Sequence, residues 1–276
     1  MESLRDQVPH CETLLLEKQG PTLFITINRP DVRNAMSLEM VAELSAVFTQ
    51  IENDLHIRAV VIRGVGGHFC AGGDIKDMAG ARGQKAVEGE ADPFYRLNRA
   101  FGQMIQQVNE SSKVVIAITE GAVMGGGFGL ACASDVAIAG PSAKFGMPET
   151  SLGVIPAQIA PFVVERIGLT QARRLALLGL RVDANEACRL GIVHQVAESE
   201  VEIDELLGHA VDRVQQCAPN ATAQTKALLH RVGNESMSGL LDSAAGKFAE
   251  AIRSDEGSEG TLAFMQKRPA SWAKSD

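Results

Sequence analysis

The sequence is poor in large aromatic residues, in positive charge and in closely spaced cysteines. It holds one Trp and one Tyr, and its formal net charge is −8. Few rings are therefore available to stack on bases, and no excess of Lys and Arg is available to bind nucleic-acid phosphates or anionic membrane surfaces. We expect a protein that binds neither nucleic acid nor membranes.

The five cysteines are odd in number and no two have the CxxC spacing of zinc ribbons. A disulfide framework is therefore not expected, and a reducing compartment is. No apolar run approaches membrane-spanning length, and the first ten residues lack the apolar core of a secretory signal. No cluster of His, Asp and Glu suggests a metal site. We expect a cytoplasmic protein without bound metal.

What the sequence does contain is an alternation of short β-branched runs and helical segments as far as about residue 196. The runs predict strands at residues 22–28, 58–63, 113–119 and 134–139. Residues 37–53 have the apolar spacing of a helix, with Ser37 as its N-cap. Strands that alternate with helices predict an α/β fold with parallel strands joined by crossovers.

The last third of the chain has helical spacing almost throughout. Residues 201–217, 221–232 and 237–254 predict three helices, which Gly233 and Gly257 punctuate. We therefore divide the chain into a core of residues 1–200 and a helical module of residues 201–276. Residues 78–92 are polar and rich in Gly and Ala, and they predict either a mobile loop beside a site or a plain solvated insertion.

Two glycine-rich segments follow predicted strands, at residues 67–76 (GHFCAGGDIK) and 121–130 (GAVMGGGFGL). Glycine lets a ligand approach the backbone closely, and free N–H groups at a turn or a helix N-terminus bind an anion or a polarised carbonyl. The second segment enters a helix predicted over residues 127–134, and it lacks the Lys–Ser/Thr of a P-loop. Either segment taken alone is also compatible with an ordinary turn that needs glycine.

A third segment, residues 145–150 (FGMPET), carries Glu149 in a stretch that is otherwise largely uncharged and apolar through Ile159. A carboxylate in such surroundings needs a reason. Glu149 is either a surface glutamate on a loop or a general acid/base with a raised pKa.

Together these segments resemble the crotonase, or enoyl-CoA hydratase/isomerase, superfamily. The motifs stand at residues 28–36 (NRPDVRNAM), 69–76 (FCAGGDIK), 125–139 (GGGFGLACASDVAIA), 145–156 (FGMPETSLGVIP), 187–196 (ACRLGIVHQV) and 264–268 (FMQKR). They occur in the family's order and cover roughly residues 13–268. The resemblance implies an α/β crotonase spiral of repeated ββα turns, with a C-terminal helical module for trimerisation, and hence a homotrimer or hexamer.

The resemblance also implies the site. The backbone amides of Gly73 and Gly126 match the family's oxyanion hole, and Glu149 matches a catalytic carboxylate. An acyl-CoA substrate would run along residues 71–76 and past residues 31–33, and coenzyme A is then part of the substrate, so no cofactor is expected. The implied substrate-binding residues are Arg33, Ala71, Gly73, Asp74, Ile75, Lys76, Gly126, Phe264 and Lys267.

Two positions depart from the typical hydratase. The first of the family's two glutamates would fall at Gly129, which has no side chain, so the two-carboxylate clamp on water cannot form in the usual way. We expect Gly129 to enlarge the acyl pocket. Many relatives have a basic residue at the position of Asp31, and Arg33 is the candidate to replace it as the phosphate partner.

The leading interpretation is a hydratase that adds water to a conjugated, branched enoyl-CoA with Glu149 alone. Residues 153–168 (GVIPAQIAPFVVERIG) resemble branched-chain hydratases that act on isohexenylglutaconyl- or methylglutaconyl-type thioesters. The alternative is a Δ3–Δ2 enoyl-CoA isomerase, which moves one proton between C2 and C4 and needs no water. A non-catalytic acyl-CoA- or RNA-binding member is the third reading, which the acidic charge and the retained Glu149 oppose.

Overall fold

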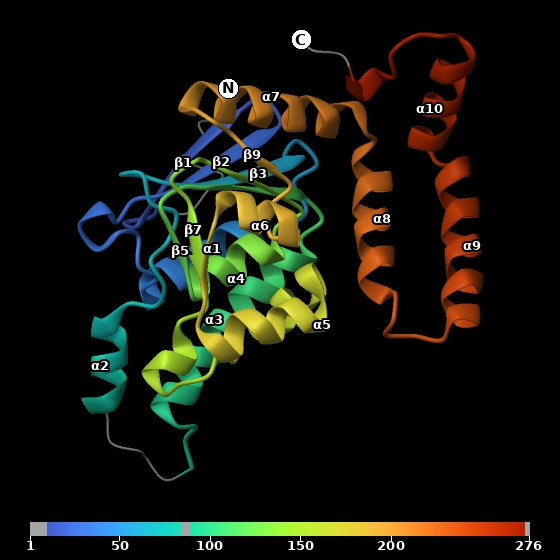
Figure 1. The fold of residues 1–276 in the computed structure, drawn as a ribbon. Coiled ribbons are helices and arrows are strands. Elements are labelled where there is room, and N and C mark those ends of the chain that lie inside the picture. Colours follow the sequence, from blue (N-terminus) through green and yellow to red (C-terminus); the bar gives the residue numbers. More distant parts are fainter. Residues whose placement is uncertain (1–9, 84–88, 274–276) are drawn as a thin grey trace.

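The computed structural model describes residues 10–83 and 89–273, and its strands form two sheets (Figure 1). The larger sheet has the order β1-β2-β3-β4-β6-β9, and the smaller has the order β5-β7-β8. The strands are β1 (Leu14–Gln19), β2 (Thr22–Ile27), β3 (Ala59–Gly64), β4 (Val114–Thr119), β5 (Ala122–Met124), β6 (Val136–Ala139), β7 (Lys144–Gly146), β8 (Arg181–Asp183) and β9 (Gln195–Val196).

The larger sheet confirms the four predicted strands and adds an antiparallel edge. Strands β2, β3, β4, β6 and β9 pair in parallel. Strand β1 pairs antiparallel with β2 through a two-residue turn at Gly20 and Pro21, and Gly20 has a φ of 54°. Glycine suits this left-handed turn position. Strand β1 could not be predicted from its residues, LLLEKQ, because they include no β-branched side chain.

The helices lie after and around these strands (Figure 1). They are α1 (Leu38–Ile51), α2 (Ile75–Gly83), α3 (Pro93–Glu110), α4 (Gly126–Ala133), α5 (Ala160–Leu178), α6 (Ala184–Leu190), α7 (Glu200–Gln216), α8 (Pro219–Arg231), α9 (Met237–Arg253) and α10 (Asp255–Met265). Among the described residues, short 3₁₀ turns occur at η2 (Pro30–Val32), η3 (Glu149–Leu152) and η4 (Ser271–Ala273). None of the described helices is both long and apolar enough to cross a membrane.

The expected spiral of ββα turns is confirmed. One turn runs from β4 in the larger sheet to β5 in the smaller sheet and then to α4, and the next runs from β6 to β7 and on to α5. Two isolated parallel bridges join Met36 to Gly73 and Cys70 to Val123. The second bridge connects β5 of the smaller sheet to the segment that follows β3. The connections after β3, β5 and β7 meet, since a Cβ on Gly125 would lie 3.6 Å from Gly72 Cα and 2.9 Å from Glu149 Oε1.

Side chains alternate between the two faces of the larger sheet, as the pleat requires. Val60 and Ile62 face the main core, which includes Leu44 of α1 and Met104 of α3, whereas Val61 faces a second cluster. That second cluster contains Ile116 and Ile118 of β4 and Ile203 and Leu207 of α7. Helix α7 therefore covers the face of the sheet opposite α1 and α3.

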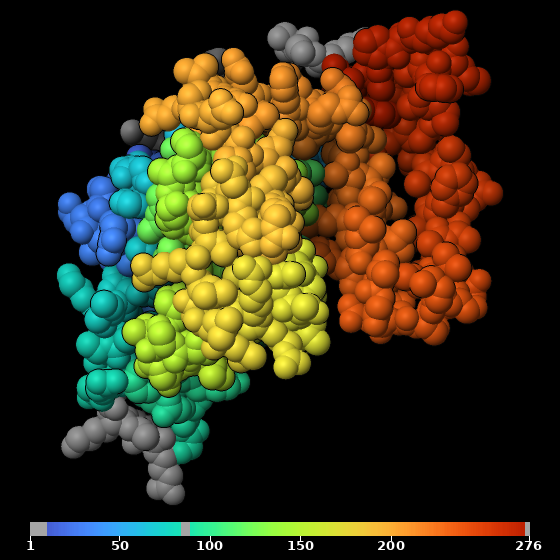
Figure 2. Space-filling model, viewed as in Figure 1, coloured from blue at the N-terminus to red at the C-terminus, as the bar shows by residue number. Residues whose placement is uncertain are grey.

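The C-terminal helices confirm the predicted helical texture, with one corrected boundary. Helices α8, α9 and α10 stand beside the sheet core and form one flank of the visible face (Figures 1 and 2). The break after α9 falls at Ser254, whose hydroxyl accepts from Gly257 N at 3.1 Å, so Gly257 lies inside α10 rather than ending a helix. A Cβ on Gly257 would overlap Ala251 O, so this glycine permits the tight corner between α9 and α10.

The loop predicted for residues 78–92 is partly wrong. Residues 78–83 belong to α2, residues 84–88 lie outside the described residues, and Asp92 caps α3 by accepting from Phe94 N and Tyr95 N. Helix α2 was not predicted because Ala81 is its one buried residue, so its sequence has no apolar periodicity. Its Met and Ala residues are nevertheless good helix formers.

Candidate active site

One cavity of about 700 Å³ brings the two glycine-rich segments and the candidate acid/base together. Gly73, Gly126 and Glu149 all line it. The rest of the wall comes from α1, α2, α3 and the segment before α5, and most of it is apolar. The structure thus gathers residues that lie more than seventy positions apart in the sequence into one site.

The backbone around Gly73 aims one free N–H away from its neighbours. Met36 N donates to Gly72 O at 2.8 Å, and Asp74 N donates to Met36 O at 2.9 Å. In such an extended pairing the N–H between these two groups points the other way. The Gly73 N–H accordingly has no hydrogen-bond acceptor among the described residues. It is available to a ligand in the cavity.

Gly126 supplies the second free amide as the first residue of α4. Its N–H belongs to the first turn of the helix, where no intrahelical acceptor exists and the helix dipole is positive. The preceding Gly125 has φ 50° and ψ −117°, a conformation that requires glycine. A Cβ on Gly125 would lie 2.9 Å from Glu149 Oε1 and 3.6 Å from the Gly72 Cα, so both glycine loops and the carboxylate meet at this point.

Glu149 is a half-buried carboxylate at the start of η3, not a surface glutamate. Burial raises the pKa of Glu149 above its ordinary value, and its own backbone N–H opposes this only in part. Its Oε2 is buried and has no hydrogen-bond partner among the described residues. A buried, unpaired carboxyl oxygen beside a cavity can bind a polar hydrogen there and exchange a proton with it.

An ion pair braces the Gly73 loop from behind. Arg29 donates to Asp74 Oδ2 at 2.7 Å, and Lys76 N donates to Asp74 Oδ1 at 2.8 Å. Burial would raise the pKa of Asp74, but the hydrogen bonds from Arg29 and from the Lys76 amide together lower it. Both carboxylate oxygens are therefore occupied within the protein, and the Asp74 side chain holds the loop rather than presenting a free group to the cavity.

The expectation that Gly129 enlarges the pocket is wrong. A Cβ on Gly129 would overlap Ile159 and lie 3.1 Å from Ile105 Cδ1. Gly129 is buried, and Ile159, a cavity-lining residue, fills the place toward which a side chain would point. The position of the family's first glutamate is thus closed by apolar packing, so Glu149 is the one carboxylate at the two positions of the family's catalytic glutamates.

The other predicted binding residues divide into two groups. Ala71 N donates to Arg33 O at 3.1 Å, so these two predicted contacts adjoin, and Asp74 and Ile75 line the cavity with Lys76 directly after them. Phe264 and Lys267 instead lie at the end of α10, on the opposite side of the chain from α2 (Figure 1). Within one chain they are not brought to the cavity.

Helix α3 contributes cavity residues that were not predicted from the sequence. The Phe101 ring lies 3.4 Å from the Cβ position of Gly126, and Asn98 lines the same cavity. Gln158, from the segment before α5, lines it as well. The amphipathic spacing of residues 93–110, with a capping Asp92 before Pro93, was the available signal for this helix.

Other reactive side chains have structural roles. Cys70 is fully buried, and burial raises the pKa of its thiol to about 11, so it is not an activated nucleophile. His68 Nδ1 accepts from Ala122 N at 3.0 Å and so ties the first glycine loop to β5. In the part of the chain that the structure describes, no three His, Cys, Asp or Glu side chains are grouped so that they could hold a metal ion.

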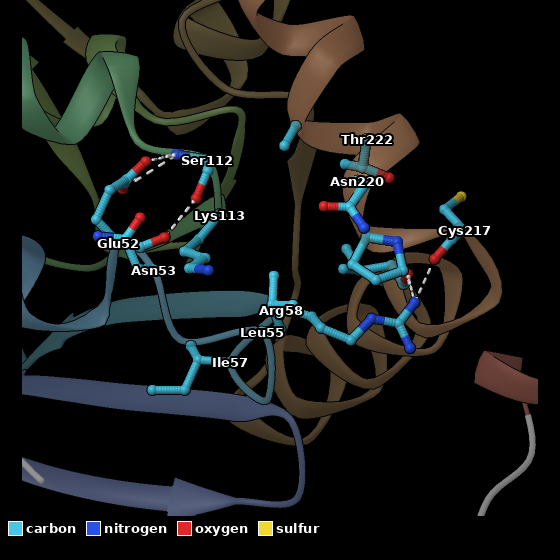
Figure 3. Close-up of a pocket in the computed structure, with 13 residues that line it drawn as sticks. Glu52, Asn53, Leu55, Ile57, Arg58, Ser112, Lys113, Cys217, Asn220 and Thr222 are labelled. Carbon is cyan, nitrogen blue, oxygen red and sulfur yellow. Dashed lines mark hydrogen bonds between the residues drawn. The ribbon is translucent and has the colours of Figure 1, made fainter. Parts of the chain in front are cut away.

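A second hollow, of about 310 Å³, lies where α7 and α8 meet the core (Figure 3). The Arg58 guanidinium crosses it and donates to Val214 O and Gln215 O, each at 2.9 Å, and to Cys217 O. Lys113 Nζ donates to Asp54 O at 2.8 Å. These cations are engaged by backbone carbonyls, so the hollow holds the end of α7 against the core.

Comparison with known proteins places these features in a family. A family model described as enoyl-CoA hydratase/isomerase matches residues 17–275. The crystal structure of an enoyl-CoA hydratase/isomerase from Marinobacter aquaeolei is 80% identical, with a TM-score of 0.94 over 96% of this chain and 100% of that one. The structure of Pseudomonas aeruginosa AtuE is 56% identical, with a TM-score of 0.91 over 95% and 100%. A probable enoyl-CoA hydratase of Bacillus subtilis is 33% identical over 245 residues, 88% of this chain and 92% of that protein.

Proposed function

The chain is an enzyme of the enoyl-CoA hydratase/isomerase family, and we propose that it adds water to a conjugated, branched enoyl-CoA thioester with Glu149 as its one acid/base. The observation that carries the proposal is the meeting of Gly73, Gly126 and Glu149 in one cavity. A hydratase needs both a place for negative charge on the thioester oxygen and a group that handles the proton of water. These three residues supply both.

The two free amides suit the charge that develops during hydration. When water adds at C3 of the conjugated thioester, electrons move into the carbonyl and an enolate oxyanion forms. The N–H groups of Gly73 and Gly126 have no competing acceptor among the described residues and are held by the surrounding backbone. Preformed donors of this kind stabilise an oxyanion without reorganising, and one donor typically contributes about 2.7–4 kcal/mol.

Glu149 suits both proton transfers. As a carboxylate it takes a proton from the attacking water, whose oxygen forms the new bond to C3. As the resulting carboxylic acid it returns a proton to C2, so that the enolate becomes the saturated hydroxyacyl thioester. A raised pKa brings the two protonation states closer in free energy near neutral pH, which favours a group that must act in both directions.

The apolar wall supports a bulky acyl group. Ile159 stands in the place of a second carboxylate, and Phe101, Val154 and Ile155 line the cavity beside it. Burial of each additional CH₂ against such a wall contributes about 0.8 kcal/mol. Among conjugated thioesters we therefore favour branched ones of the isohexenylglutaconyl or methylglutaconyl type over crotonyl-CoA.

Incorporation of labelled water separates this proposal from the alternative. The protein is incubated with a branched 2-enoyl-CoA in ¹⁸O-water while the absorbance of the conjugated thioester and the product mass are followed. A hydratase bleaches the conjugated absorbance and yields a hydroxyacyl product that carries ¹⁸O. A Δ3–Δ2 isomerase, for which a single glutamate also suffices, would convert a 3-enoyl-CoA into the conjugated thioester and incorporate no label.

A further inference from the structure

The largely apolar cavity wall is interrupted by a group of polar side chains. Asn98 on α3 and Gln158 before α5 both line the cavity, and Gln158 Nε2 donates to Asn98 Oδ1 at 2.9 Å. A Cβ on Gly102 would overlap Gln158 Oε1 and lie 2.9 Å from Arg99 Nη1, so the guanidinium stands beside the Gln158 amide. Gly102 thereby leaves the notch on α3 that receives Gln158.

This group has free donors but few free acceptors. Asn98 Oδ1 already accepts from Gln158, whereas Asn98 Nδ2 donates to none of the described residues. Arg99 is half-buried and forms no hydrogen bond or ion pair within residues 10–83 and 89–273. A guanidinium and an amide NH₂ can only donate, so the matching ligand group is one that only accepts. An ionised carboxylate is such a group, and it also neutralises the arginine.

Asn98 and Gln158 lie near the candidate oxyanion hole in the same cavity. Phe101 touches the position of Gly126, and Asn98 precedes Phe101 by three residues on the same face of α3. That spacing corresponds to about 4.5 Å along the helix axis. A few bonds of an acyl group span this distance, so a substituent on the acyl branch, rather than the thioester itself, would meet Asn98.

We propose that Asn98 and Gln158, which line the cavity, form with the adjoining Arg99 a carboxylate subsite that selects enoyl-CoA thioesters whose acyl branch ends in a carboxylate. This rests on the proposed function, because it assigns the substrate class of the same cavity. The apolar wall receives the hydrocarbon part of the acyl group, and the subsite distinguishes a dicarboxylic thioester from a neutral one of the same shape.

Binding of two saturated thioesters tests the subsite without any hydration step. The probes are 3-methylglutaryl-CoA and 3,5-dimethylhexanoyl-CoA, which have similar shape and differ in whether the branch ends in a carboxylate. Calorimetry should show that the wild type binds the carboxylate probe more tightly. Asn98→Leu, Gln158→Leu and Arg99→Met should each weaken binding of that probe by about 10- to 100-fold, as expected for a lost charge-assisted hydrogen bond. Binding of the neutral probe should stay within about twofold of wild type.

Three further variants control for changes elsewhere on α3. Gln103→Leu and Arg96→Met remove an amide and a guanidinium from exposed positions of the same helix and should leave both affinities unchanged. Gly102→Ala removes no donor and improves helix propensity, but its methyl group displaces Gln158. It should therefore lower the preference for the carboxylate probe in a protein that is fully folded.

Two results would overturn the subsite: equal wild-type affinity for both probes, or an equal loss for both probes in the three subsite variants. Neither probe can be hydrated, so this outcome is independent of the proposed reaction. A protein that selects the carboxylate probe but never adds ¹⁸O would keep the subsite and lose the hydratase proposal. A protein that hydrates without charge selection would do the reverse.

Discussion

At the scale of single residues, Glu149 makes the sharpest prediction. Glu149→Gln removes the proton-transfer group and keeps its size, so we expect turnover to fall by about 10²–10⁴-fold while affinity for a saturated acyl-CoA is retained. Steady-state kinetics and calorimetry on the same preparation measure the two quantities. Turnover near that of the wild type would remove Glu149 from the mechanism.

The raised pKa of Glu149 also predicts how stability depends on pH. A carboxyl whose pKa is higher in the folded than in the unfolded state contributes stability that is fully present below the unfolded value and is lost as the pH rises through the folded value. Desolvation is the main cause of the shift. Thermal unfolding should therefore show Glu149→Gln more stable than wild type at pH 8, with the gap shrinking toward pH 4. A gap that is constant across this range would mean that the Glu149 pKa is the same in both states.

The closed position at Gly129 predicts that a second carboxylate cannot simply be restored. Gly129→Glu alone should destabilise the protein by several kcal/mol, because its Cβ overlaps Ile159 and its charge enters an apolar wall. The pair Gly129→Glu with Ile159→Ala makes room for the side chain. Compared with Ile159→Ala alone, the pair should raise kcat/KM for crotonyl-CoA by about tenfold or more. No gain in a folded double variant would show that a carboxylate at residue 129 does not reach the reacting water.

These residues differ in how far the sequence could predict them. The family resemblance carried by the glycine motifs and by the segment around Glu149 predicted Gly73, Gly126 and Glu149 as site residues. The filling of the Gly129 space by Ile159 could not be predicted, because it depends on how a segment thirty residues later packs against α4. The same holds for Asn98 and Gln158, which meet only because Gly102 leaves a notch.

At the scale of elements, caps and alternating apolar residues predicted most boundaries well. Ser37 does begin α1, since its hydroxyl accepts from Met40 N at 3.2 Å. Elements without a buried stripe, such as α2, gave no periodic signal. Long-range contacts between elements could not be predicted from the sequence. The clearest example is the contact of Arg58, just before β3, with the end of α7.

The contacts of Arg58 predict how much the junction between β3 and α7 contributes to the free energy of unfolding. Its guanidinium binds the last carbonyls of α7 and also Trp272 O at 2.9 Å, so Arg58→Met leaves several acceptors without their donor. We expect the free energy of unfolding to fall by about 3 kcal/mol, the sum of a few such charged hydrogen bonds reduced by partial solvation. Arg213→Met is the matched control, because Arg213 is exposed at the same helix end and donates to the Gln216 side chain rather than to the carbonyls of the junction. A similar loss in both variants would assign the effect to helix α7 rather than to the junction.

At the scale of the whole molecule, the C-terminal helices expose more apolar surface than their own packing covers. Phe248 on α9 is 69% exposed and Phe264 on α10 is 85% exposed, and Leu241 and Met265 are exposed as well. Apolar patches of this kind mark interaction surfaces. We propose that this face mediates the self-association that the family resemblance implies, and sedimentation at micromolar concentration should therefore show a trimer or hexamer.

Self-association would also explain why Phe264 and Lys267 do not line the cavity of their own chain. If they contact CoA, each must do so in the cavity of a neighbouring copy. Each site would then combine Glu149 of one chain with Phe264 and Lys267 of another. Closed symmetric assembly makes such sharing equivalent at every interface.

Mixing two defective variants tests whether the site is shared. Glu149→Gln lacks the acid/base, and the pair Phe264→Ala with Lys267→Ala lacks the C-terminal contacts, so each homogeneous assembly should be weakly active at low acyl-CoA concentration. In trimers formed by co-expression with two different tags and purified through both, about one site in three would combine an intact Glu149 with an intact C-terminal pair from the neighbour, because every such closed ring holds chains of both kinds. Activity of the mixed assembly should therefore exceed that of either parent. If both residue sets served the same chain's cavity, every chain would carry one defect and mixing would restore nothing.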